Sequence, residues 1–322
     1  MSKNKNLHTE NSFKSPILII IFNRSKYLKK ISTILNKIKP LKIYIAADGP
    51  RKNIKYDLLK CKIAREALLN NINWKCKILK KFSKKNLGLK KNIIESLNWF
   101  FQNESKGIIL EDDCYPNISF FKFCDELLKK YEDNNKIKMI SGNFYFQKNF
   151  KLNDSYFFSK RPGTHGWATW ARSWAENDID MKKWKGFVDF LFLFFFFKLN
   201  LTKSHYFFKK FKSAYLNKIK SWDYQWLYSI WKNNGLIIRP SKNLCKHIGW
   251  GPESTHGKGR DTFPKLKNSK MNFPLTHPNK IYQNNTLDNF EDKIVRKLNF
   301  ISYFKYKLLN KIKTNIDYFF KK

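Results

Sequence analysis

The stretch Gly107-Ile-Ile-Leu-Glu-Asp-Asp-Cys-Tyr-Pro116 places three consecutive acids directly after a short apolar run. Ile108 to Leu110 is too short for a helix and predicts a buried parallel strand. Glu111, Asp112 and Asp113 then fall at the C-terminal edge of a sheet, where open α/β sheets bind ligands. Adjacent carboxylates repel one another unless a cation or hydrogen-bond donors compensate, and a divalent ion meets that need. A solvated acidic turn before a helix is the alternative interpretation.

On both sides of this stretch, apolar runs alternate with segments of helical periodicity. Strands are predicted at 16–22, 41–46 and 74–80, and helices at 25–38, 56–69, 90–101 and 118–131, with a further short strand at 138–141. Ser25 is the expected N-cap of the first helix. Polar residues follow the first two strands, namely Asn23-Arg24 and Asp48. This alternation predicts an α/β fold with a mostly parallel sheet flanked by helices.

Downstream the sequence becomes aromatic and less periodic. The segment 156–170 mixes Phe, Tyr and Trp with Gly and His, which fits either a sugar-binding surface or ordinary core. The run Phe190–Phe197 is too short to span a bilayer, and its flanking lysines favour an interfacial segment over a buried helix. A helix is expected from Ser221 to about Gly235, a strand at 236–240 and a glycine-rich lid at 245–257.

The charge of the chain is strongly positive, with 64 Lys and Arg against 25 Asp and Glu. Only eight of these cations are arginines, so the excess is lysine, whereas base readout in nucleic acids favours bidentate arginine. We therefore expect no specific nucleic-acid partner. The basic segment 291–322 has Phe and Leu at helical spacing, and it is expected either to lie on an anionic membrane or to pack on the domain as an outer helix.

The five cysteines lack Cys-x-x-Cys spacing, so neither a zinc site nor a disulfide framework is indicated. Residues 1–15 are polar, lack the apolar core of a signal peptide, and are expected to form a disordered tail. These features favour a cytoplasmic protein, peripheral at the inner face of the membrane if the basic segment binds lipid.

Several of these motifs, taken in order, resemble the GT-A fold nucleotide-sugar glycosyltransferases, with the N-acetylglucosaminyltransferase I type as the nearest pattern. The resemblance runs from about residue 16 to residue 257 and rests on Asn23-Arg24, Asp48, Glu111-Asp112-Asp113, Gly166-Trp167, Trp222-Asp223 and Ser254-Thr255-His256-Gly257. It implies a nucleotide-sugar-binding half at 16–145, an acceptor and catalytic half at 146–290, and the basic helix at 291–322.

The resemblance also implies a role for each matching residue. Asp113 would bind Mn²⁺ or Mg²⁺, and Asp223 would be the catalytic base. Nucleotide-sugar contacts would come from Arg24, Asp48, Glu111, Asp112, Trp167, Trp222 and His256. The family pattern has two adjacent acids after the tryptophan, whereas Tyr224 follows Asp223 here, so Asp223 could instead cap its helix.

The predicted function is a metal-dependent inverting glycosyltransferase that uses a nucleotide-diphosphate sugar, with UDP-linked donors preferred. The acceptor would be a glycan or a lipid-linked saccharide in cell-surface polysaccharide synthesis. One alternative is a nucleotidyltransferase that makes sugar nucleotides, although Asn23-Arg24-Ser25 is not the glycine-rich phosphate loop such enzymes need. The other is a non-catalytic nucleic-acid-binding protein driven by charge, whose binding would fall steeply with salt.

Overall fold

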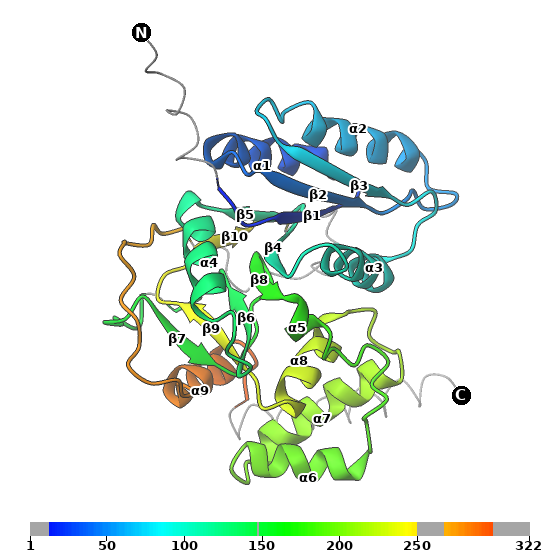
Figure 1. The fold of residues 1–322 in the computed structure, drawn as a ribbon. Helices are drawn as coiled ribbons and strands as arrows, with labels where there is room; N and C mark the ends of the chain where they lie inside the picture. The colour runs from blue at the N-terminus through cyan, green and yellow to red at the C-terminus, as the bar shows by residue number, and fades with distance from the viewer. Residues whose placement is uncertain (1–12, 147, 250–266, 299–322) are drawn as a thin grey trace, which may run out of the picture. The chain divides into compact units, whose positions relative to one another are not determined.

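The computed structural model describes residues 13–146, 148–249 and 267–298. The chain divides into two compact units, the first comprising Met1–Asn177 and Ser229–Gln283 and the second Asp178–Tyr228 and Asn284–Lys322 (Figure 1). The boundaries predicted at residues 145 and 290 divide the chain by function rather than by compactness. They stay a prediction. The last residues of the expected tail are packed on the first unit, because the ring of Phe13 packs edge-on against Phe121 and Ser15 donates a hydrogen bond to Asp125. Residues 1–12 lie outside the described residues.

The first unit is built on a mixed, mostly parallel sheet. Within the described residues it has eight strands, in the spatial order β3 (Lys77–Phe82), β2 (Lys42–Ala47), β1 (Ile17–Ile21), β4 (Lys106–Glu111), β8 (Trp167–Trp170), β6 (Ile137–Ser141), β9 (Leu236–Pro240) and β7 (Tyr156–Ser159). The pairs β3–β2, β2–β1, β1–β4 and β6–β9 are parallel. Strand β8 runs antiparallel to both β4 and β6, and β7 runs antiparallel to β9. The predicted α/β class, with a mixed, mostly parallel sheet flanked by helices, is confirmed.

Helices cover both faces of the first four strands. They are α1 (Ser25–Ile38), α2 (Asp57–Leu69), α3 (Leu89–Phe101) and α4 (Ile118–Lys130), followed later by the short α5 (Ala171–Trp174). Leu28 and Leu35 of α1 belong to the same buried core as the alternate β1 residues Ile17, Ile19 and Ile21. Because successive strand residues point to opposite faces, helix α3 packs on the other side, where the Phe100 ring meets Tyr44 at 4.9 Å.

The start of α1 differs from the expectation. Ser25 is the first helical residue rather than the N-cap, and Arg24, at the N-cap position, makes no side-chain capping hydrogen bond. No acid lies in the first turn. The helix N-terminus therefore keeps its partial positive charge without a carboxylate from its own first turn.

A short antiparallel pair, β5 (Cys114–Pro116) with β10 (Cys245–His247), lies directly after the acidic stretch. Only a strand at Ile108 to Leu110 was predicted here, and no local pattern indicated this pair. His247 pairs with Cys114 in its register. The pairing brings a segment from late in the chain next to Asp113.

The second unit is helical in its described part. It contains α6 (Phe187–Phe196), α7 (Leu201–Tyr215) and α9 (Asn285–Ile294), and α8 (Asp223–Lys232) begins in this unit and ends in the first. The Phe197 ring stacks on Phe207 at 5.3 Å. No helix in the described ranges is both long and apolar enough to cross a membrane. Most of the predicted basic helix, from residue 299 onward, lies outside the described residues.

Candidate functional site

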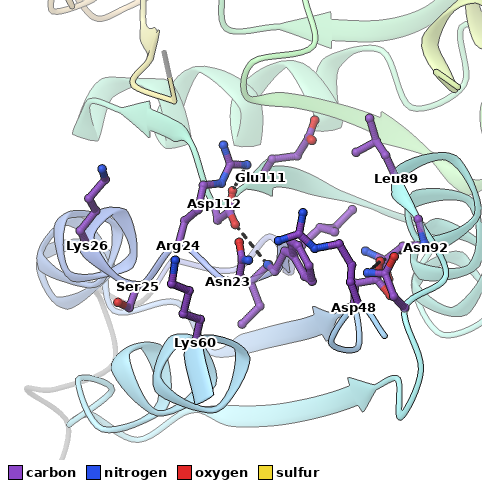
Figure 2. Close-up of a pocket in the computed structure, with 16 residues that line it drawn as sticks. Asn23, Arg24, Ser25, Lys26, Asp48, Lys60, Leu89, Asn92, Glu111 and Asp112 are labelled. Carbon is purple, nitrogen blue, oxygen red and sulfur yellow. Dashed lines mark hydrogen bonds and ion pairs between the residues drawn. The ribbon is translucent and has the colours of Figure 1, made fainter. Parts of the chain in front are cut away.

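A cavity of about 670 Å³ lies in the first unit, where strands β1, β2 and β4 end. It is lined by residues of the β1–α1 connection, by the end of β2, by the start of α3 and by the end of β4 (Figure 2). Acids and cations share its wall: Asp48, Glu111 and Asp112 with Arg24, Lys26, Arg51 and Lys60. The C-terminal edge of parallel strands is where such folds bind ligands. The acidic stretch therefore reaches the place that the sequence predicted.

Arg24 compensates the charge of two of the three acids. One end of its guanidinium forms an ion pair with Asp112, and its Nη1 lies 3.0 Å from Asp113 Oδ2. The second oxygen of Asp112 accepts the backbone N–H of Phe22 at 3.1 Å. Burial raises the pKa of Asp112 to about 6, although the positive charge of Arg24 opposes that rise. For Asp112 and Asp113, the compensating positive charge therefore comes from Arg24 of the same chain.

Asp113 faces histidines as well as Arg24. His247 Nε2 lies 3.3 Å from Asp113 Oδ2, and the His165 ring lies over His247 with its centroid 4.4 Å away. Burial alone would raise the pKa of Asp113, but the hydrogen bond with His247 and the charge of Arg24 hold it well below its ordinary value. Burial and the neighbouring His247 lower the pKa of His165 to about 4. His165 is therefore neutral at pH 7, and Asp113 is ionised.

Asn143 fixes the two histidine-bearing segments to each other. Its side-chain amide donates to the carbonyls of His165 and Cys245, each at 3.0 Å, and accepts the His165 N–H at 3.2 Å. Asn143 is fully buried, so these bonds are made in a dry environment where each is costly to lose. The position of His247 beside Asp113 is consequently built into the core.

Asp48 is buried, and its carboxylate holds the wall of the cavity. It accepts four hydrogen bonds, from the backbone N–H groups of Gly49, Leu87 and Gly88 and from the side chain of Asn86, at 2.7–3.1 Å. A carboxylate has about four acceptor positions, so all of them are used within the chain. The geometry gives Asp48 a role in positioning the segment 86–88. The predicted contact between Asp48 and the nucleoside stays a prediction.

A second buried acid, Asp57, was not predicted as part of the site. Its carboxylate accepts from Asn23 Nδ2 at 2.7 Å and from Arg51 through three bonds of 2.8–3.0 Å. The Arg51 guanidinium also lies over the Phe22 ring, 5.4 Å from its centroid. The hydrogen bonds from Arg51 lower the pKa of Asp57 to about 2. This group fixes the β1–α1 connection, which forms one wall of the cavity.

Asn92, on the first turn of α3, contributes a polar group to the cavity. The residue is only 7% exposed and lines the cavity, yet its side-chain amide makes no hydrogen bond with another described residue. Buried polar side chains are almost always hydrogen-bonded, so this amide has the environment of a ligand-binding group. No local sequence pattern indicates this residue, because a single Asn in a helix is common and only the cavity distinguishes it.

A divalent ion at Asp113 was expected, and the described residues fit one in part. Asp113 Oδ2 and His247 Nε2 are an oxygen and a nitrogen donor of the kinds that Mn²⁺ accepts. Neighbouring ligands on an octahedral ion lie about 3 Å apart, close to their separation. No group of three His, Cys, Asp or Glu side chains is arranged around an ion within the described part of the chain. This pair could therefore supply two ligands, and Arg24 now contacts the same oxygen.

The other predicted site residues are placed as follows. Trp167 is a buried residue of β8 and is not part of the cavity wall. Trp222 and Asp223 belong to the second unit, where Asp223 begins α8 and accepts a hydrogen bond from Ser221. His256 lies outside the described residues, as does most of the predicted lid. The roles of these four residues stay predictions, whereas Arg24, Asp48, Glu111 and Asp112 do line one cavity.

Comparison with known proteins gives a likeness in structure only. No protein-family model matches the chain, and no curated protein matches it at a significant level. HddC from Yersinia pseudotuberculosis aligns over 49% of this chain and 77% of its own, with 12% identity and a TM-score of 0.29. The mannosyltransferase PcManGT from Pyrobaculum calidifontis, in complex with GDP-Man and Mn²⁺, aligns over 52% and 48%, with 10% identity and a TM-score of 0.33.

A UDP-glucose pyrophosphorylase complexed with UDP-glucose aligns over 50% of this chain and 78% of its own, with 10% identity and a TM-score of 0.31. About half of this chain is thus similar, at low TM-scores, to the mannosyltransferase and the pyrophosphorylase, which were solved with nucleotide sugars. The likeness to the N-acetylglucosaminyltransferase I type stays a prediction.

Proposed function

We propose that the chain is a glycosyltransferase that takes a sugar from a nucleotide-diphosphate sugar, with UDP-linked donors preferred. The observation that carries this proposal is the cavity of about 670 Å³ at the ends of β1, β2 and β4, lined by both acids and cations. Small-molecule sites usually measure about 300–1,000 Å³ and combine an apolar wall with a few placed polar groups. A nucleotide sugar needs cations for its diphosphate and acceptors for its hydroxyls, and this wall offers both.

In this proposal the diphosphate lies near the N-terminus of α1. Helix N-termini attract phosphate through their free N–H groups, and α1 has no side-chain cap or first-turn acid of its own. Lys26 and Lys60 line the same cavity and add positive charge. Asn92 donates and accepts hydrogen bonds toward the nucleoside or the sugar. Glu111 and Asp112 accept hydrogen bonds from donor hydroxyls.

Asp113 and His247 would hold Mn²⁺ or Mg²⁺ once the donor is bound. The ion would act as a Lewis acid on the departing diphosphate. The chain's own contribution is to hold this carboxylate and imidazole together through Arg24, Asn143 and the β5–β10 pair. Binding of UDP to Asp113→Ala and His247→Ala, measured with and without Mn²⁺, tests the assignment. Both variants should lose the gain in affinity that Mn²⁺ gives the native protein.

The acceptor would be a glycan or a lipid-linked saccharide. Asp223 would accept the proton of the attacking hydroxyl, which gives transfer with inversion. Trp167 and Trp222 are proposed to contact the donor or acceptor sugar, and His256 to close over the diphosphate. With a lipid-linked acceptor, the chain would work as a peripheral protein at the inner face of a membrane.

The decisive experiment distinguishes glycosyl transfer from nucleotidyl transfer. The purified full-length chain is incubated with UDP- and GDP-sugars, and release of the nucleoside diphosphate is measured with and without acceptor glycans. In parallel, nucleoside triphosphate and sugar 1-phosphate are supplied, and pyrophosphate is measured. Diphosphate release supports the proposal, whereas pyrophosphate release would establish the nucleotidyltransferase alternative. Donor at 100 times its Kd should also stabilise the fold by about 2.7 kcal/mol.

Nucleic-acid binding is tested in the same preparation. A filter-binding assay with DNA and RNA at rising salt should show only weak retention that salt abolishes. Tight nucleic-acid binding together with no stabilisation by nucleoside diphosphates would overturn the proposed function.

A further inference from the structure

Helix α6 presents an apolar face to solvent in the second unit. Phe187 is 70% exposed and Phe195 is 69% exposed, with Leu191 between them also exposed. These three residues are spaced four apart, so they lie on one side of the helix. Val188 adds to this side, and Leu199 and Leu201 extend it into the start of α7. We call these six residues the α6 face.

The opposite side of α6 is fixed to the unit. Asp189 is fully buried and accepts a hydrogen bond from the Tyr228 hydroxyl at 2.9 Å, and Leu193 is buried beside the turn that leads to α7. Phe190 meets Phe208 of α7 edge-on at 5.5 Å. The helix is therefore held in one rotation, and the α6 face is the side that this anchoring directs outward.

Exposed lysines flank the α6 face at both of its ends. Lys182, Lys183 and Lys185 precede α6, and Lys198 follows it. Exposed contiguous apolar surface of this kind marks an interaction site in a soluble domain. A protein partner could cover the apolar residues, but the three lysines before α6 and Lys198 after it match an anionic surface in charge.

We propose that the α6 face is a docking surface for an anionic lipid bilayer. Helix α6 has 10 residues, far fewer than the roughly 20 needed to span a bilayer, so it lies in the plane of the headgroups. Phe187, Leu191 and Phe195 enter the boundary between headgroups and acyl chains, and the flanking lysines contact the lipid phosphates. This inference depends on no part of the proposed reaction.

The test is flotation of the full-length chain with vesicles of phosphatidylcholine containing 30% phosphatidylserine, compared with phosphatidylcholine alone. The native chain should float with the anionic vesicles. The triple variant F187S/L191S/F195S should reduce the partition constant by about tenfold or more, because the apolar area that enters the bilayer is lost. The variant K182Q/K183Q/K185Q should reduce it by about fivefold per lysine and weaken its salt dependence.

The matched control is L58S/L59S/I63S on α2, which removes three exposed apolar side chains from the first unit. It should float as the native chain does. Equal flotation of the native chain and F187S/L191S/F195S would overturn the proposal, as would loss of flotation in the control alone. Urea unfolding midpoints verify that each variant is folded.

A second copy of the chain is the rival occupant of the α6 face. Light scattering after size-exclusion chromatography without lipid measures the molar mass and shows whether the chain is a dimer. A native dimer that becomes monomeric in F187S/L191S/F195S, with flotation unchanged, would replace the proposal by a dimer interface. Binding of nucleoside diphosphate should be the same in all variants, so that failure of the proposed function and failure of this surface remain separate results.

Discussion

The backbone of Gly249 lies directly against the carboxylate of Asp113. A Cβ added to Gly249 would come within 2.6 Å of Asp113 Cβ and 2.7 Å of its Oδ2. The preceding residue is also attached, because the Ile248 N–H donates to the Asp113 carbonyl at 2.8 Å. Ile248 and Gly249, which follow β10, are thereby held against the acid that pairs with Arg24.

Replacing Gly249 with alanine is expected to push Asp113 away from Arg24, because the added methyl group has no space beside the Asp113 carboxylate. Overpacking of this kind costs about 1–3 kcal/mol. Affinity for UDP should fall about tenfold or more, as measured by calorimetry. Gly186→Ala is the control, because Gly186 has φ +58° and open space around it. That variant should lose about 1 kcal/mol of stability through backbone strain and keep its affinity.

Replacing Arg24 with methionine should destabilise the fold by about 3–5 kcal/mol, because Asp112 would lose its cation while buried beside Asp113, which would keep only His247. The double variant R24M/D112N removes one of those charges and should recover a large part of the loss. Urea unfolding of the native chain, R24M, D112N and R24M/D112N gives the coupling energy. If the stability losses of R24M and D112N simply add in the double variant, the ion pair between Arg24 and Asp112 is not energetically significant.

Replacing Asn92 with alanine should weaken donor binding about fivefold, the worth of one hydrogen bond, without loss of stability. Alanine is the better helix former, and the native amide has no partner to lose in the part of the chain that the structure describes. Calorimetric titration with UDP, compared with the exposed Asn70→Ala, measures the effect. A drop in the unfolding midpoint of N92A with unchanged affinity would assign Asn92 to the fold instead.

Replacing Asp57 with asparagine tests the pH dependence of stability. The folded-state pKa of Asp57, about 2, lies below its ordinary value of 3.8. The ionised carboxylate therefore stabilises the fold above about pH 4, and this contribution is lost as the pH falls through about 2. It amounts to about 2 kcal/mol at neutral pH. In denaturant unfolding, the free energy of unfolding of D57N should lie below that of the native chain by this amount at pH 7 and by less at pH 3. The exposed Asp180→Asn should have the same free energy of unfolding as the native chain at both pH values.

Replacing Asp223 with asparagine should lower turnover roughly 100-fold and leave donor binding intact, because a general base acts on the acceptor hydroxyl alone. Asparagine can still serve at a helix start, so helix stability is preserved. Ser221→Ala, which removes the hydrogen bond to Asp223, should have a smaller effect on turnover. Near-normal turnover in D223N would refute the base and direct attention to Glu253 or Asp180.

Local sequence was sufficient for the elements that bury a continuous apolar run. Strand β1 and helix α1 were predicted within one residue of their bounds, since Ile17–Ile21 is apolar throughout and Leu28, Ile31 and Leu35 recur at helical spacing. Strand β3 was placed too early, because Lys77–Phe82 is half lysine and gives no clear apolar signal.

Contacts between distant segments were not predictable. Strands β7 and β8 have four residues each, and their aromatic residues are equally typical of a loop that binds sugars. The contact between Asp113 and His247 depends on the β5–β10 pair, which no local pattern indicates. The acids at the end of β4 could be placed from sequence, but the ion pairs that Arg24 makes with Asp112 and Asp113 could not, because Arg24 follows a different strand.

The position of β8 sets a condition on how this protein is made. Strand β8 lies between β4 and β6, so the centre of the sheet closes only after residues 167–170 have left the ribosome. Until then, β4 presents an unpaired apolar edge of the kind that recruits other strands. A nascent chain that stops at residue 145 would carry that edge without its covering strand, and chaperones would have to shield it during synthesis.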